Sequence, residues 1–314
     1  MSVKPIIESL EMLDIDDDTY FKEYASYISN SRLSLINPAQ GGSVDKYLNN
    51  VRSFSTSFSI GSAVHQCVLQ EGEYQINETV DLPTGKMGSM ADYLYKYYKQ
   101  GGVSCEDVIQ ASNCVNYYKG KMDDAKVSNV FEKCTPYWEG RSKVEQEENK
   151  LIPIYLDAKS RNTAKSCINS LHNNKTIMDL LHPEDSKSYM EATFLIDFNV
   201  NGKILKFKAK LDNFTIDESL GIVVLNDLKT TGHYVDKFSE SFDKYHYYRQ
   251  MAVYAWLLKL WCDKNGISIN GFTSNMLLVS TINADTSIYK VGKYQIIKGL
   301  REFNKLMLMA SEWY

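Results

Sequence analysis

Alternating apolar and polar positions mark the most regular part of the chain. Residues 203–214 (KILKFKAKLDNF) have the period of two that is typical of a half-buried strand. Residues 190–198 (MEATFLIDF) are β-like, and Asn201–Gly202 between the two segments is a strong hairpin signal. After a further turn, residues 222–231 (IVVLNDLKTT) begin as a buried strand and end polar. The pattern therefore predicts a meander of three consecutive strands.

Helical periodicity dominates the remaining chain. Residues 58–69 and 243–260 predict long helices, while the acidic start, residues 1–30, is only loosely periodic. The other expected elements are a helix–turn–helix at 28–48, helices at 93–99, 117–126 and 163–181, strands at 275–280 and 287–290, and a closing helix at 292–312. Strands and helices in this order predict an α/β fold.

Composition narrows the class of protein. The 314 residues are 44% hydrophobic and 24% charged with a net charge of −4, which is typical of a globular chain and argues against nonspecific coating of nucleic acid. A single basic channel for DNA, or carboxylates around a metal, is compatible with this charge. No apolar run is long enough for a membrane span, and the acidic N-terminus has no secretory signal, so we expect a cytoplasmic protein. The six cysteines form no C-x-x-C pair, which predicts reduced thiols and no cysteine-bound metal.

The predicted sheet carries the candidate chemistry on Glu191, Asp212, Asp227 and Lys229. Asp227 and Lys229 are two residues apart on a strand and therefore share a face. A carboxylate beside a lysine at a polar strand end can hold a divalent metal and place a cation over an attacking water. Asp212 is expected at the end of one strand and Asp227 late in the next, so a bend or bulge is needed to bring them together.

These residues stand in the order of a known family. Asp212 followed by Asp227-Leu228-Lys229 resembles the signature of the PD-(D/E)XK nucleases. Gln250-x-x-x-Tyr254 is similar to the Q-x-x-x-Y element of the RecB-like branch, and Gly61-Ser-Ala-Val-His65 resembles the histidine helix of the exonuclease VIII (RecE-type) phage nucleases. The ordered set is far more specific than any one of these motifs.

The resemblance covers about residues 28–75 and 188–260. It implies an α/β restriction-endonuclease-like core, with a mixed central sheet flanked by helices, and a helical elaboration. It further implies one PD-(D/E)XK nuclease domain over residues 1–314, with a mostly helical insertion at 76–187 between the histidine helix and the catalytic sheet.

The function implied by the resemblance is metal-dependent hydrolysis of DNA by a 5′→3′ double-strand exonuclease of phage recombination. Such an enzyme would be encoded by a phage or prophage and would act on linear duplex in the bacterial cytoplasm. The implied cofactor is Mg²⁺ or Mn²⁺, and the candidate partners are a single-strand annealing protein and further copies of the chain in a ring.

The resemblance also implies roles for particular residues. Lys229 would orient and help to deprotonate the attacking water, while Gln250 and Tyr254 would position the scissile strand. The implied metal ligands are His65, Glu191, Asp212, Asp227 and the Leu228 carbonyl.

Structural interpretations of the same residues stay open. Asp227 and Lys229 can form a surface ion pair, Asp212 can be a turn residue, Glu191 can face solvent, and His65, Gln250 and Tyr254 can belong to the core. The stretches 92–99 and 244–249, rich in Tyr and Lys, either contact bases and phosphates or pack as amphipathic helices. Lys206, Lys208 and Lys210 share a face that is either solvated or a phosphate track. A structure-directed endonuclease, a non-catalytic DNA-binding module and a helical scaffold are the alternative functions.

Overall fold

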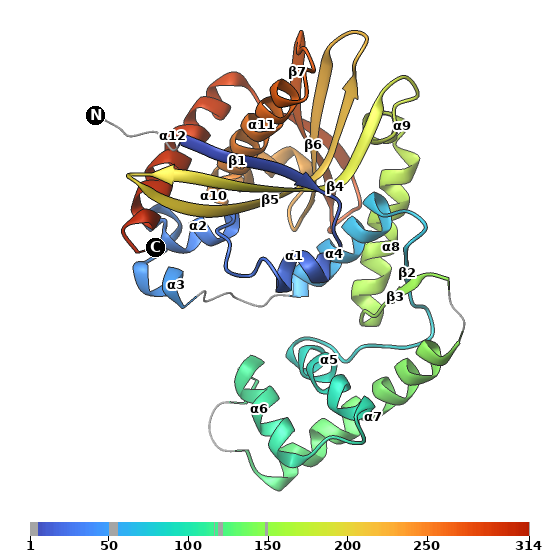
Figure 1. Ribbon diagram of the computed structural model, residues 1–314. Helices are drawn as coiled ribbons and strands as arrows, with labels where there is room; N and C mark the ends of the chain where they lie inside the picture. The colour runs from blue at the N-terminus through green and yellow to red at the C-terminus, as the bar shows by residue number, and fades with distance from the viewer. Residues whose placement is uncertain (1–5, 50–55, 116, 119–121, 148–149, 314) are drawn as a thin grey trace. The chain divides into compact units, whose positions relative to one another are not determined.

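The predicted meander forms the centre of a six-stranded mixed sheet, drawn in Figure 1. Asn201 and Gly202 both have positive φ, 53° and 82°, as a two-residue hairpin loop requires. The strands lie in the order β1-β4-β5-β6-β7-β8, and only the β6–β7 pair is parallel. The bounds are β1 Ile6–Leu13, β4 Lys187–Val200, β5 Lys203–Asp217, β6 Ile222–Thr231, β7 Gly271–Ser280 and β8 Thr286–Lys290.

Two compact units make up the chain, and each is described by itself. Unit 1 comprises Met1–Ser53 and Ser170–Tyr314, and unit 2 comprises Phe54–Asn169. The computed structural model describes residues 6–49, 56–115, 117–118, 122–147 and 150–313.

Helices flank the sheet of unit 1, as the expected restriction-endonuclease-like core requires. Helix α11 contacts β1 and β6, α12 contacts β4, and α9 contacts β5 and β6. Since β6 and β7 are parallel, the chain between them must cross over, and α10 and α11 make that crossover. The helices of this unit are α1 Asp17–Lys22, α2 Asn30–Ile36, α3 Val44–Leu48, α9 Lys175–Leu181, α10 Phe238–Lys244, α11 Tyr247–Lys264 and α12 Lys293–Ser311, with 3₁₀ turns at Pro38–Gln40 and Val235–Lys237.

Side chains along the central strands point alternately to two faces of the sheet. One face is apolar, and the other carries polar side chains that are also buried. Val223 and Leu225 of β6 belong to the main core together with side chains of α11 and α12. On the other face Asn226 donates to Asn213 of β5 (2.8 Å) and to the Leu180 carbonyl of α9 (3.0 Å). Amide pairs in this buried row fix the relative register of the strands, because a slip would leave buried polar groups unsatisfied.

Unit 2 is mostly helical around a core of its own. Trp138 of α7 donates its indole N–H to the Ala91 carbonyl of α5 (2.9 Å), which joins the two helices inside that core. The elements are α4 Thr56–Leu69, β2 Tyr74–Ile76, α5 Lys86–Lys99, α6 Cys105–Val115, α7 Asp124–Gln146, β3 Ile152–Ile154 and α8 Ala158–Asn173, which runs past the boundary of the unit. The predicted insertion at 76–187 thus corresponds to α5–α9 with β3, and α9 belongs to unit 1. The assignment of one nuclease domain stays a prediction.

Three segments differ from the expected elements. Residues 6–13 form strand β1, although their acidic sequence shows no clear alternation. The helix expected at 117–126 is wrong, since among its described residues only those from Asp124 onward are helical. The long helix expected at 243–260 is broken, because His246 takes a left-handed conformation (φ 55°) between α10 and α11. Among the described helices, none is long and apolar enough to cross a membrane.

Candidate active site

The hairpin register brings Asp212 to β6. The sequence analysis expected Asp212 at the end of its strand. Strand β5 continues to Asp217, so Asp212 lies inside the strand instead. The two strands pair up to Asn213↔Asn226, and beyond this pair Asp212 Oδ2 accepts a hydrogen bond from the Leu228 N–H at 2.8 Å. The register of the two strands up to Asn213↔Asn226, followed by this hydrogen bond, therefore places Asp212 beside the Asp227–Lys229 segment.

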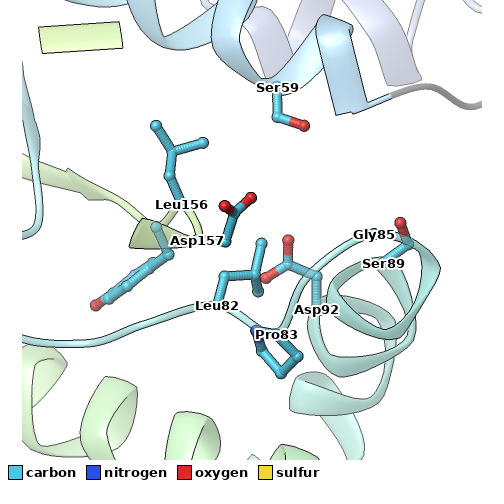
Figure 2. Close-up of a pocket in the computed structure, with 9 residues that line it drawn as sticks. Ser59, Leu82, Pro83, Gly85, Ser89, Asp92, Leu156 and Asp157 are labelled. Atoms are coloured by element: carbon cyan, nitrogen blue, oxygen red, sulfur yellow. The ribbon is translucent and has the colours of Figure 1, made fainter. Parts of the chain in front are cut away.

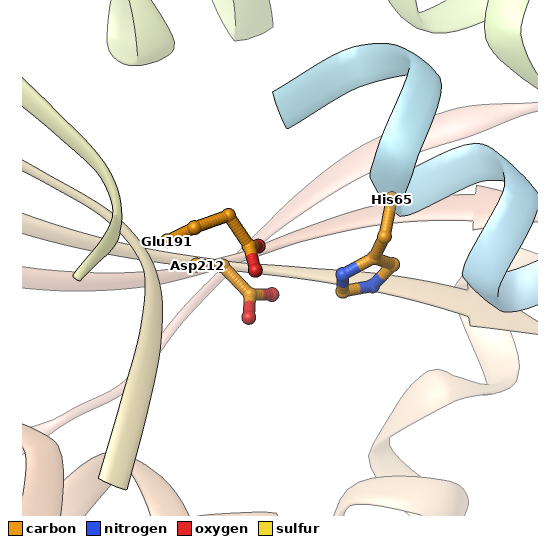
Figure 3. Close-up of side chains that lie close together, drawn as sticks. All are labelled: His65, Glu191 and Asp212. Carbon is orange, nitrogen blue, oxygen red and sulfur yellow. The ribbon is translucent and has the colours of Figure 1, made fainter. Parts of the chain in front are cut away.

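A local distortion lies where Glu191 of β4 faces Asp212 of β5. Both flanking pairs keep the same register, but Glu191 has φ 51°. A left-handed conformation costs a residue other than glycine roughly 1–3 kcal/mol, and outside turns such strained residues cluster at functional sites. Along β5 every second residue faces the main core up to Leu211, but the next core-facing residue is Phe214, three positions further on. The alternation of the two faces of β5 therefore shifts by one residue at this point. Figure 3 shows the two carboxylates side by side, and ligand oxygens of Glu191 and Asp212 lie within 4.8 Å of each other.

Asp227 is fully buried and is held from two sides. Its Oδ2 lies 2.5 Å from Lys229 Nζ, and its Oδ1 accepts from Gln250 Nε2 at 2.9 Å. The same Gln250 nitrogen lies 3.2 Å from the Tyr254 hydroxyl one helical turn further along α11. The structure thus brings together four of the predicted residues on the face of the sheet that α11 covers.

Lys210 and Asp17 border these carboxylates; the sequence analysis assigned Lys210 only to a face of three lysines and did not single out Asp17. Lys210 Nζ lies 2.7 Å from Glu191 Oε2 and 2.6 Å from Asp17 Oδ1 in the first turn of α1. No local pattern connects residue 17 with residue 210, so only the folded chain reveals this pair.

The other two lysines of the predicted face have different environments. Lys208 is buried and donates to the Tyr20 carbonyl (2.6 Å), whereas Lys206 is exposed. The three lysines therefore do not form a common solvated face or phosphate track.

Burial and like charge shift the pKa values at this site. Burial, together with the Asp212 charge, raises the pKa of Glu191 to about 7 despite the neighbouring Lys210. Burial also raises the pKa of Asp212, against the effects of Lys229 and the Leu228 N–H. For Lys229 burial lowers the pKa, but Asp227 and Asp212 outweigh it and hold the pKa above its usual range. Lys229 is therefore a cation, and the carboxylates opposite it carry an electrostatic cost that a bound cation would reduce.

The remaining predicted ligands lie as follows. The Leu228 carbonyl oxygen is 3.4 Å from Lys229 Nζ. His65, the third side chain drawn in Figure 3, lies half-buried on α4 in unit 2. Its assignment as a metal ligand stays a prediction.

A small cavity lies within unit 2 (Figure 2). It encloses about 60 Å³ between the start of α5 and the loop before α8, and Asp92 and Asp157 line it together with Leu82. The Asp157 carboxylate caps α8 through the Ser160 N–H (3.1 Å), and Asp92 accepts from Tyr137 and Arg141. Both carboxylates have structural partners and the volume suits a few water molecules, so we assign this cavity no substrate.

Comparison with known proteins leaves the function open. No protein-family model matches the sequence, and no curated protein matches it. Among solved structures, the chain is similar to a "putative exonuclease" from Eubacterium rectale, with 14% identity and a TM-score of 0.48 over 95% of this chain and 86% of that one. It is also similar to the protein SSO0001, with 12% identity and a TM-score of 0.25 over 81% of this chain and 87% of that one. Neither similarity identifies a function for this chain.

Proposed function

We propose that the protein is a metal-dependent deoxyribonuclease that hydrolyses phosphodiester bonds in DNA. The observation that carries the proposal is the convergence of Asp212, Asp227 and Lys229 at the point where β5 and β6 stop pairing. A buried carboxylate (Asp227), a half-buried one (Asp212) and a fixed ammonium group beside them are the polar groups that hydrolysis of a phosphodiester needs.

The residues present fit a hard divalent cation. Glu191 and Asp212 offer carboxylate oxygens within 4.8 Å of each other, and oxygen ligands suit Mg²⁺ and Mn²⁺. Burial raises the pKa of both groups, so a bound cation would favour their charged forms. We propose that Glu191, Asp212, Asp227 and the Leu228 carbonyl hold the ion, with His65 as a further ligand. When bound, the ion would acidify the attacking water and offset charge on the phosphate.

The protein's own groups supply orientation. Lys229 keeps its proton and is anchored on Asp227, so it would hold the attacking water and the phosphate oxygen in place as a donor. Removal of the water's proton by Lys229, which the sequence analysis included, would require the loss of that proton first. Gln250 fixes the orientation of the Asp227 carboxylate and is itself adjacent to Tyr254. The direct role of these two residues would therefore be to position Asp227, and any effect on the DNA strand would be indirect.

Hydrolysis of labelled DNA tests the proposal. Linear duplex labelled at the 5′ or the 3′ end, and closed circular duplex, would be incubated with and without Mg²⁺. We expect metal-dependent loss of linear DNA, at least 100-fold slower with Asp227→Asn and unchanged with Asp263→Asn, an exposed acid of α11. Residual activity of Asp227→Asn within about tenfold of wild type, a cost near 1.4 kcal/mol, would rule out a ligand role.

The finer proposal is a 5′→3′ exonuclease of phage recombination that acts on linear duplex. It rests on the similarity of Gly61–His65 and Gln250–Tyr254 to the motifs of the exonuclease VIII type. Earlier release of the 5′ label and survival of closed circles are the expected results. Cleavage of closed circles would instead identify an endonuclease, and binding without cleavage a non-catalytic DNA-binding module. A single-strand annealing protein and a homo-oligomeric ring remain proposed partners on the same basis.

A further inference from the structure

The break between α10 and α11 changes the directions of two tyrosines. His246 is left-handed, and its Nδ1 lies 2.8 Å from Glu302 Oε1 of α12, which anchors the break. In a continuous helix residues two apart point about 200° away from each other. Here the rings of Tyr245 and Tyr247 instead lie 5.7 Å apart and tilted by 44°. The two rings therefore lie next to each other because the helix is interrupted.

These rings continue a row that begins at the candidate active site. Lys229 Nζ lies 5.6 Å from the centre of the Tyr247 ring, and Lys244 Nζ lies 5.2 Å from the centre of the Tyr245 ring. The order Lys229, Tyr247, Tyr245, Lys244 thus leads away from Asp227 by successive contacts of 5.2–5.7 Å. We call these four residues the aromatic row.

Exposure rises along the aromatic row. Lys229 is largely buried, Tyr247 is half-buried and stacks on Phe238 (5.9 Å, 10°), and 48% of Tyr245 is exposed. Hydrophobic packing accounts for Tyr247 but not for Tyr245, whose ring is open to solvent. Lys244 is exposed beside this ring, and the adjacent Asp243 is paired with Lys298 at 3.0 Å.

We propose that the aromatic row binds unpaired nucleotides of the DNA strand at the candidate active site, with Tyr245 stacking on a base and Lys244 contacting a phosphate. This inference rests on the proposed function for the identity of the ligand. Aromatic rings alternating with cations are the surface by which proteins hold single strands without regard to sequence, since every base has a flat face. The row gives such a strand a path that ends at Lys229.

A binding assay in EDTA tests this inference without hydrolysis. The probe is a short oligothymidylate that carries one 2-aminopurine, whose fluorescence is quenched when the base stacks. We expect Tyr245→Ala to bind at least fivefold more weakly and to lose the quenching, while Tyr245→Phe stays within about twofold of wild type. Tyr294→Ala removes a tyrosine of α12 that is 78% exposed and should leave binding and quenching unchanged.

The possible results separate this inference from the proposed function. Wild-type binding by Tyr245→Ala, equal losses in Tyr245→Phe and Tyr245→Ala, or no binding of the probe by the wild-type protein would each overturn the inference, even if the protein hydrolyses duplex DNA. Conversely, binding that depends on the Tyr245 ring in a protein that hydrolyses no DNA would support the aromatic row and contradict the nuclease assignment. A fivefold loss in Lys244→Ala that disappears at high salt would support the phosphate contact, and no loss at low salt would exclude it.

Discussion

The carboxylate of Asp212 accepts a hydrogen bond from the backbone N–H of Leu228 at 2.8 Å, one residue beyond the last β5–β6 pair. The Asp212 side chain therefore gives the buried Leu228 N–H an acceptor at the point where the backbone pairing of β5 and β6 ends. The same carboxylate lies beside Glu191, so Asp212 combines a structural contact with a candidate ligand role.

Two substitutions separate these roles of Asp212. Asp212→Asn keeps an oxygen that can accept from Leu228, whereas Asp212→Ala leaves that N–H without its acceptor. In EDTA we expect Asp212→Ala to have a lower free energy of unfolding than Asp212→Asn by about 1–3 kcal/mol, measured by urea denaturation. Both variants should lose Mg²⁺ binding and hydrolysis. Wild-type Mg²⁺ affinity in Asp212→Asn would show that the carboxylate has only the structural role.

The pKa of Glu191 predicts a pH dependence of the metal-free protein. A folded-state pKa of about 7, above the ordinary 4.5, means that the folded protein keeps a proton that the unfolded chain releases. The resulting stabilisation is present below about pH 4.5 and is lost as pH rises through 7. Between pH 5 and pH 8 in EDTA, the free energy of unfolding should therefore fall more steeply in wild type than in Glu191→Gln. Glu184→Gln, an exposed acid, is the matched control and should keep the wild-type slope. An unchanged slope in Glu191→Gln would assign the raised pKa to another group.

The local sequence pattern predicted the strands but not their convergence. The β-like run at 190–198, the alternation at 203–214 and the apolar run that opens 222–231 are each a local property of one strand, and they predicted it directly. The position of Asp212 depends on the register of β5 against β6, which the buried pair Asn213–Asn226 helps to fix across 13 residues. Individual strand patterns contain no such information, so the sequence analysis could only expect a bend or bulge without placing it.

Other parts of the candidate site depend on contacts that are remote in sequence. The distortion at Glu191 and the pairing of Lys210 with Asp17 arise only when β4, β5 and α1 are assembled. Similarly, helical periodicity continues through residues 243–260, and the break at His246 is linked to Glu302 of α12. Long-range polar contacts thus override a regular local pattern at these places.

Lys229 should stabilise the metal-free fold as well as assist hydrolysis. Asp227 is fully buried and Lys229 Nζ lies 2.5 Å from it, so Lys229→Met leaves a buried carboxylate without its cation. Loss of one partner of a buried ion pair typically costs about 3–5 kcal/mol. We expect Lys229→Met to melt well below wild type in EDTA, to regain much of the difference in Mg²⁺, and to hydrolyse DNA at least 100-fold more slowly. Calorimetry should show Mg²⁺ binding at wild-type affinity or tighter, and loss of metal binding in this variant would contradict an orienting role for Lys229.

His65 provides the test of whether α4 contributes to the metal site. A neutral imidazole is a softer ligand than a carboxylate and accepts Mn²⁺ more readily than Mg²⁺. If His65 is a ligand, His65→Ala should lose most Mg²⁺-supported hydrolysis and regain part of it with excess Mn²⁺, while its melting temperature in EDTA stays close to that of wild type. Gln66→Ala changes the next residue of the same helix and should leave the metal dependence unchanged. A core role predicts the opposite, namely an earlier melting transition in His65→Ala with the Mg²⁺ and Mn²⁺ titrations of wild type. Melting temperature and metal titrations on the same preparation decide between these outcomes, because the loss of a ligand changes the metal dependence and the loss of core packing changes the stability.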